Sequence, residues 1–269
     1  MPTPFYHLSL AEELLSHPGL ADAVRQFLET FYGEFLFGNT APDVQVVSGQ
    51  AREATHFFSL PIQVNDHPAW KCMLSEHPHL AGAGKLDAAQ AAFLAGYLCH
   101  LQADWNWVMD IFAPKFGPDC TWGTFSQRLY YHNVLRSYLD LHIVDNLPAG
   151  IDTCLSQVAP ANWLPFVQDR HLVDWRNFLT PQLEPGGTIQ TVEVFSSRQG
   201  ICAPEYYALL QSEERMEQEI FTQLPLAGVK EYNLKVLDEN ISFLNEYLVF
   251  TLHPTPVPID RRVFRGAQR

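Results

Sequence analysis

A histidine and an aspartate one helical turn apart give the clearest chemical signal in this sequence. His100 and Asp104 lie in a proline-free, alanine-rich stretch, 87–112, that favours a helix. Residues four positions apart on a helix share one face, so this imidazole and this carboxylate can bind one metal ion together. The spacing alone is not specific, because the chain has 11 histidines and 30 acidic residues. A core histidine beside a surface aspartate is the alternative interpretation of the pair.

Two further possible ligands precede this pair, in the segment 38–63, which has no helical stripe. This segment contains Asp43 and His56, and loops of such length in compact domains usually have a function. With His100 and Asp104 they form a set of two nitrogen and two oxygen ligands, which suits Zn²⁺ or a similar divalent ion. Because this four-ligand set is complete, we predict about one tightly bound ion.

The elements that must position these residues are mainly helices. Apolar residues recur with helical spacing through most of the chain, which predicts an all-α protein. The first helix is expected to begin at the capping box of Ser9 and Glu12, and Gly96 permits close packing of helices. Further helices are expected over 20–31, 68–76, 87–112, 124–145, 164–179, 204–223 and 229–252. Three short stretches, 44–47, 56–60 and 188–195, are expected to be extended.

A stretch with several prolines and a glycine, 146–165, is the best position for an internal boundary. We therefore expect residues 1–146 to form a metal-binding helical region. Residues 147–253 should form a helical extension packed on it, within one compact domain. Residues 254–269 should form a tail rich in proline and arginine.

The charge of the chain limits the class of substrate. The formal net charge is −13, and four of the 17 basic residues lie within 261–269. The rest of the chain should therefore repel polyphosphates, so a general nucleic-acid binder is not expected. A small phosphoester or a lipid head group is the better substrate, and the oligomeric state stays open.

The cellular location is expected to be the cytoplasm. The longest unbroken apolar run, Ala91–Cys99, is much shorter than the roughly 20 residues that a membrane-spanning helix needs. The first fifteen residues contain no basic segment followed by an apolar one, so no signal peptide is expected. Five cysteines without a CxxC motif suit free thiols in a reducing compartment.

Three motifs in sequence order resemble the zinc-dependent phospholipase C and single-strand-specific nuclease superfamily. They are Phe37–Asp43, Ala54–Phe57 and Gly96–Asp104, and the start, Thr3–Ala11, is similar to the prokaryotic branch of that superfamily. The resemblance covers about residues 1–145. It implies an all-α bundle of the phospholipase C and nuclease type, followed here by a C-terminal helical extension. It also implies a trinuclear zinc cluster and hydrolysis of phosphodiester bonds.

The resemblance also implies roles for individual residues. The first zinc site would consist of Asp43, His56, His100 and Asp104, with Asp104 able to bridge two ions. His7 would belong to the third site and His132 to the second. Asp43 and Asp104 are then the expected catalytic carboxylates, with Asp43 also orienting the attacking water.

The chain departs from the family pattern at the second site. Asp110 stands where the family has a histidine, and Arg136 stands where it has a carboxylate. Arginine stays protonated and cannot bind a metal. We expect Asp110 and Arg136 to form a partly buried ion pair in this degenerate second site, the alternative being two unrelated surface charges.

Three functions remain compatible with these patterns. The first is a zinc-dependent, phospholipase C-like hydrolase that cleaves a phosphoester with metal-activated water. The second is a non-enzymatic helical metalloprotein, or a degenerate family member, with a structural or regulatory ion, since four protein ligands at one ion also suit structural zinc. The third is a metal-free helical interaction protein. The sequence contains no GxSxG motif and no phosphate-binding glycine loop that would indicate another chemistry.

Overall fold

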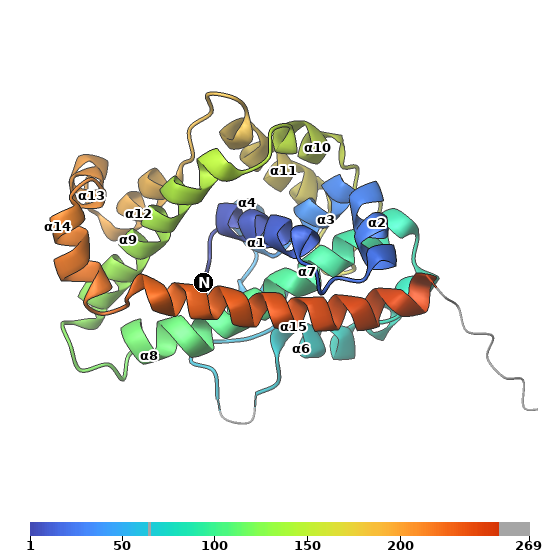
Figure 1. Ribbon diagram of the computed structural model, residues 1–269, viewed down its shortest axis with the longest axis horizontal. Helices are drawn as coiled ribbons and strands as arrows, with labels where there is room; N and C mark the ends of the chain where they lie inside the picture. Colours follow the sequence, from blue (N-terminus) through green and yellow to red (C-terminus); the bar gives the residue numbers. More distant parts are fainter. Residues whose placement is uncertain (64–65, 253–269) are drawn as a thin grey trace, which may run out of the picture.

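The fold consists of helices and their connections. The computed structural model describes residues 1–63 and 66–252, and within these ranges it contains no β-strand (Figure 1). The predicted all-α class is therefore confirmed. None of the helices in the described part of the chain is long and apolar enough to cross a membrane. The predicted tail, 254–269, lies outside the described residues.

The first helix, α1 (Pro4–Ser16), begins earlier than predicted. Thr3 is its N-cap, with the side-chain oxygen accepting a hydrogen bond from the Tyr6 amide at 3.3 Å. Pro4 suits the first helical position because its fixed φ is helical and its missing N–H would be unpaired there. The expected start at Ser9 is wrong, because the earlier cap is used, and His7 is consequently a helical residue.

The centre of the molecule is α7 (Ala88–Asn106), which continues directly into a π-helical turn, η4 (Trp107–Phe112). The Asp87 side chain caps α7 by accepting from the Gln90 amide at 2.9 Å. Helix α7 is buried on nearly all sides, which explains its apolar sequence. The long C-terminal helix α15 (Leu226–Leu252) packs beside it and follows the long axis of the molecule (Figure 1).

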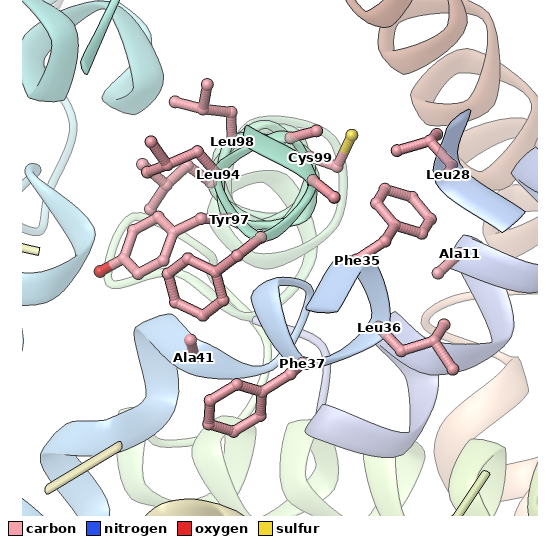
Figure 2. Packing of buried hydrophobic residues seen from close by; sticks show 14 of the residues in the cluster. Ala11, Leu28, Phe35, Leu36, Phe37, Ala41, Leu94, Tyr97, Leu98 and Cys99 are labelled. Atoms are coloured by element: carbon pink, nitrogen blue, oxygen red, sulfur yellow. The ribbon is translucent and has the colours of Figure 1, made fainter. Parts of the chain in front are cut away.

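Helix α3 (Tyr32–Gly38) crosses α7 at very short distance, with two glycines at the crossing. A Cβ atom on Gly96 would lie 2.1 Å from the Phe35 carbonyl oxygen, and one on Gly38 would lie 2.0 Å from the Phe93 carbonyl oxygen. Figure 2 shows the apolar side chains of α3 and α7 that pack around this crossing. The predicted role of Gly96 in close packing is confirmed, and the crossing brings the end of α3 against α7.

The segment after α3 forms short helical turns: η1 (Ala41–Val44), α4 (Gln45–Ser48) and α5 (Glu53–His56). The extended pieces expected over 44–47 and 56–60 are not formed. A strand needs a neighbouring strand for its backbone groups, and the described part of the chain offers none. These short turns place Asp43 and His56 beside α7.

The alternating stretch 188–195 is likewise not a strand. Most of it belongs to α12 (Thr191–Gln199). The other helices and turns are α2 (Asp22–Thr30), α6 (Ala69–Glu76), η2 (Pro78–Leu80), η3 (Ala83–Lys85), α8 (Ala113–Phe116), α9 (Phe125–Ile143), η5 (Val144–Asn146), α10 (Ile151–Gln157), α11 (Asp169–Leu183), α13 (Ala203–Leu210), α14 (Glu213–Arg215) and the π-turn η6 (Met216–Phe221). The boundary stretch expected over 146–165 contains α10. Side chains on both sides of this stretch, such as Phe35 and Trp175, share one apolar cluster.

Candidate metal centre

Three predicted histidine ligands converge around the carboxylate of Asp104, and a second predicted carboxylate, Asp43, lies beside them. Asp104 Oδ2 lies 3.4 Å from His56 Nε2 and 3.8 Å from His100 Nε2, while Asp104 Oδ1 lies 3.3 Å from His7 Nε2. Asp43 Oδ1 lies 3.5 Å from His56 Nε2. Four separate elements, α1, η1, α5 and α7, supply these side chains. The structure thus brings together His7, Asp43, His56, His100 and Asp104, which the sequence places up to about a hundred positions apart.

Four of the converging atoms are buried without a hydrogen-bond partner in the described part of the protein. They are the Nε2 atoms of the three histidines and Oδ1 of Asp104. An unpaired buried polar atom typically costs about 1–3 kcal/mol, so four of them aimed at one place require an explanation. A divalent ion explains them, because imidazole nitrogen and carboxylate oxygen are the ligands that zinc accepts.

Two overlapping groups of ligand atoms are compact enough to hold an ion. Within each group, the atoms lie within 4.8 Å of one another. One group is His7, His100 and Asp104, and the other is Asp43, His56 and His100. His100 belongs to both, so it is the residue on which either site depends.

The partner of His100 fixes which nitrogen faces the centre. Its Nδ1 atom lies 2.8 Å from the carbonyl oxygen of Asn39. A carbonyl only accepts hydrogen bonds, so Nδ1 carries the proton and Nε2 presents a lone pair. Asn39 follows the last residue of α3, so the close crossing at Gly96 supplies this hydrogen bond.

A two-step chain of hydrogen bonds fixes His56 in the same way. The Thr55 hydroxyl donates to the Arg52 carbonyl at 3.1 Å, and its oxygen lies 3.0 Å from His56 Nδ1. Since the hydroxyl proton is used, Nδ1–H must be the donor to Thr55, and Nε2 is again left free. Tyr97 of α7 anchors this turn by donating to the Thr55 carbonyl at 2.6 Å.

The protonation states suit metal binding. Burial lowers the pKa of His56, and burial together with His7 lowers the pKa of His100 to about 3, so both rings are neutral at pH 7. Burial alone would raise the pKa of Asp43, but the neighbouring imidazole groups of His56 and His100 hold it below its usual range, at about 2. For Asp104 the opposing effects of His100, His7 and Arg52 outweigh burial and lower the pKa well below its usual range. The ligands therefore need not lose protons to bind an ion at neutral pH.

Arg52 is a site residue that the sequence analysis did not identify. Its Nη2 atom lies 2.6 Å from Asp104 Oδ2, and its guanidinium stacks 4.5 Å from the centre of the Phe58 ring. The Arg52 side chain is 21% exposed, whereas Asp104 is 1% exposed. Arg52 lies one turn before His56, and this spacing is the only sequence signal for its position.

The predicted ion pair of Asp110 and Arg136 is wrong. Asp110 pairs with Lys235 of α15 at 2.7 Å. Arg136 donates to the Met1 carbonyl at 3.0 Å and to the Asn133 side chain. Asp110 lies in the π-turn η4, whose wider winding redirects side chains relative to a regular helix.

His132, the predicted ligand of a second site, does not reach the centre. Its Nε2 accepts a hydrogen bond from Trp107 Nε1 at 2.8 Å, and its ring packs against Phe112 and Phe116. Burial lowers the pKa of His132 well below its usual range. Its lone pair is already used by the indole N–H, so it is a neutral core histidine.

A cavity of about 280 Å³ adjoins the centre. Asp43 and Arg52 line both the cavity and the metal centre. The other walls come from the start of α1 and from α9, α11 and α12. We call this space the arginine cavity, after Arg52, Arg136 and Arg198, which line it.

Residues 6–171 match the family model of zinc-dependent phospholipase C. The chain belongs to this family. The resemblance inferred from the three motifs is therefore confirmed, and all five converging side chains lie within the matched residues. No match was found among the curated proteins or among the solved structures. In a zinc-dependent family, zinc is the first candidate for the ion at this centre.

Proposed function

We propose that this member of the zinc-dependent phospholipase C family hydrolyses a phosphoester at the metal centre. The observation that carries the proposal is the set of four buried, unpartnered ligand atoms, which lies next to a cavity large enough for a small substrate. Asp43 is the most exposed of the acidic ligands, at 18%, and it lines the cavity. A substrate in the cavity therefore meets the centre at this carboxylate.

We propose that the centre holds about one tightly bound ion. The two compact groups of ligands share His100, and a neutral imidazole has one free lone pair, so both cannot be complete at once. The residues that would form a second site are engaged elsewhere, since Asp110 pairs with Lys235 and His132 accepts from Trp107. Asp43, His56, His100 and Asp104 are the proposed ligands, with His7 beside them.

The residues around the centre would each have a separate role in hydrolysis. A bound zinc ion supplies a Lewis acid that polarises a phosphoryl oxygen and lowers the pKa of water. Asp43 would bind the ion and orient the attacking water. Arg52 holds Asp104 in place and keeps it ionised, and the exposed part of its guanidinium can bind a phosphoryl oxygen.

A non-enzymatic role for the metal is the second candidate. His7, His56 and His100 are almost fully buried, and four protein ligands at one ion are typical of structural zinc. In that case the ion would stabilise the fold where α1, α5 and α7 meet.

Hydrolysis of bis(p-nitrophenyl) phosphate tests the proposal. We expect slow release of nitrophenolate by the purified protein, which is lost after treatment with a chelator and restored by Zn²⁺. Asp43→Asn should lower the rate at least about a hundredfold, the scale typical when the reacting groups lose their positioning. The matched control is Asp174→Asn, a change on α11 outside the centre.

Two results would count against hydrolysis. A rate that does not depend on Asp43 would indicate a contaminating enzyme. A protein that binds zinc but hydrolyses none of a panel of phosphomonoesters and phosphodiesters would support the structural role instead.

A further inference from the structure

The arginine cavity has a charge opposite to that of the molecule. Among the described residues that line it, three are arginines, Arg52, Arg136 and Arg198, and one is a carboxylate, Asp43. The whole chain has a formal net charge of −13. A concave site lined by one sign of charge attracts ligands of the other sign, so this cavity favours an anion.

Arg136 is the arginine with the most unusual surroundings. Its guanidinium stacks 4.1 Å from the centre of the Phe195 ring, donates to the Met1 carbonyl and to Asn133, and leaves its buried Nε atom without a partner. No carboxylate in the described part of the chain lies within 4.0 Å of it. A partly buried guanidinium is normally paired with an anion, and here Arg136 is one of the residues that line the cavity.

Asp140, one turn after Arg136 on α9, is not the counter-ion of Arg136. Asp140 accepts hydrogen bonds from the hydroxyl groups of Thr3 and Thr191. Burial raises the pKa of Asp140 to about 7, so its negative charge is weakened at neutral pH. Arg136 keeps its charge, because burial lowers its pKa only to about 10.

The remaining walls of the cavity are largely apolar and limit the size of a ligand. They include Trp175, Phe178 and Leu179 of α11 and Val194 and Phe195 of α12. The cavity's volume of about 280 Å³ lies at the lower end of the roughly 300–1,000 Å³ that is usual for small-molecule sites. The cavity therefore accommodates an anionic group and one compact apolar group, but not two acyl chains.

We propose that the arginine cavity selects small anionic phosphoesters with a compact apolar group, and that Arg136 contacts the anionic oxygens. The inference rests on the proposed function, because it assigns the substrate class of the same site. A quaternary ammonium head group is disfavoured, because Arg136 and Arg198 would repel it. The phosphoester is either a soluble metabolite or the head group of a lipid whose chains stay outside the cavity.

Isothermal titration calorimetry of the purified full-length protein tests this inference without depending on turnover. Phenylphosphonate has an anion and an aryl group and contains no ester to cleave, and benzyltrimethylammonium is its cationic counterpart. We expect phenylphosphonate to bind and benzyltrimethylammonium not to bind. Arg136→Gln should weaken phenylphosphonate about tenfold or more, as expected for a charge-assisted hydrogen bond. Arg136→Lys should recover part of the loss, and Arg170→Gln, at an exposed arginine outside the cavity, should change nothing.

A second variant covers the case in which Arg136→Gln does not fold. Arg198 is exposed at the cavity, so Arg198→Glu should preserve the fold and still weaken phenylphosphonate several-fold. Competition with phenylphosphonate identifies the source of the phosphoester. Butyl phosphate represents a soluble phosphoester and dihexanoyl phosphatidylbutanol a lipid with the same apolar head group, and the stronger competitor indicates which of the two the cavity takes. Failure of both to compete would overturn the inference.

Two further outcomes would overturn it. One is equal binding of the anionic and cationic probes, and the other is unchanged binding in the variants at both Arg136 and Arg198. These failures are distinct from failure of the proposed function. If phenylphosphonate binding depends on Arg136 but no phosphoester is hydrolysed, the anion site stands and the proposed hydrolase function fails. If phosphoesters are hydrolysed but neither binding nor hydrolysis depends on Arg136, the hydrolase function stands and the anion site fails.

Discussion

The hydrogen bonds behind the metal ligands specify the centre as much as the ligands do. Asn39 and Thr55 each engage the Nδ1 atom of a histidine, so the lone pairs of His100 and His56 are oriented by the fold itself. Such preorganisation lets an ion bind without rearranging buried groups. The orientation of the two rings is therefore set by the Asn39 carbonyl at the end of α3 and by the Thr55 hydroxyl of α5, and not by the ion alone.

We expect His100→Ala to abolish stoichiometric metal binding, because His100 belongs to both compact groups of ligands. Native mass spectrometry of protein purified without added metal should show about one ion in the wild type and none in the variant. His171→Ala on α11 is the control and should keep the ion. Three ions in the wild type would contradict the single site, and no ion would contradict metal binding altogether.

Removal of the ion should also lower the stability of the wild type. A ligand that binds only the folded state stabilises it in proportion to the logarithm of its concentration over Kd. Chelation should therefore reduce the melting temperature of the wild type, while His100→Ala should melt at the same temperature with and without chelator. Equal shifts in both proteins would show that the chelator acts elsewhere.

The candidate site could be predicted from the sequence only in part. Spacing on one helix and the loop motifs pointed to Asp43, His56, His100 and Asp104, and the resemblance pointed to His7. Arg52 could not be found in this way, because its contact with Asp104 joins segments that only the fold brings together. The pairing of Asp110 with Arg136 was wrong because a π-turn is not visible in a helical pattern.

At the scale of elements, the crossing of α3 and α7 connects packing with chemistry. Gly38 and Gly96 let the two backbones touch, and this contact places the Asn39 carbonyl beside His100. The sequence indicated the role of Gly96 but not its partner helix. The short turns after α3 were harder to predict, because four-residue helices have no periodicity to detect.

We expect Gly96→Ala to destabilise the protein and to weaken its metal site. Alanine is favoured over glycine in a helix by roughly 1 kcal/mol, but its Cβ would lie 2.1 Å from a backbone oxygen that cannot move away alone. Overpacking typically costs about 1–3 kcal/mol, so the free energy of unfolding in urea should fall by about that amount. Zinc affinity should fall as well, since Asn39 moves with α3.

Gly228→Ala is the matched control for this variant. Gly228 also lies in a helix, α15, but an added Cβ would meet a single side-chain atom, of the buried Leu224 at 3.1 Å, and no backbone atom. This change should cost much less than Gly96→Ala, because a small shift of one side chain relieves the contact and alanine is favoured in the helix. If both variants behave alike, the crossing of α3 and α7 is not as tight as described.

At the scale of the whole molecule, Asp140 joins the start of α1 and the start of α12 to α9. It is fully buried and accepts hydrogen bonds from Thr3, the N-cap of α1, and from Thr191, the first residue of α12. These contacts hold together two walls of the arginine cavity. The stability of the fold should therefore respond to the protonation of this carboxyl.

The direction of the pH dependence follows from the pKa of Asp140. Burial raises this pKa to about 7, although hydrogen bonds from Thr191 and Thr3 and the charge of Arg136 act in the opposite direction. An unfolded aspartate has a pKa of about 3.9, so the folded state holds the proton more tightly. The stability that the proton confers is fully present below about pH 4 and is lost as the pH rises to about 7.

Asp140→Asn, which cannot ionise, should remove this part of the pH dependence. Between about pH 4 and pH 7, the free energy of unfolding of the wild type should fall relative to that of the variant, by an amount on the order of a few kcal/mol. Urea unfolding of both metal-free proteins at several pH values measures this difference, and the titration of the metal ligands cancels because both proteins share them. Asp110→Asn, at the surface pair with Lys235, is the control and should follow the wild type. If the free energies of unfolding of the wild type and Asp140→Asn change in parallel with pH, Asp140 is already ionised in the folded protein. Its neighbours would then stabilise the charged carboxylate enough to cancel the effect of burial on its pKa.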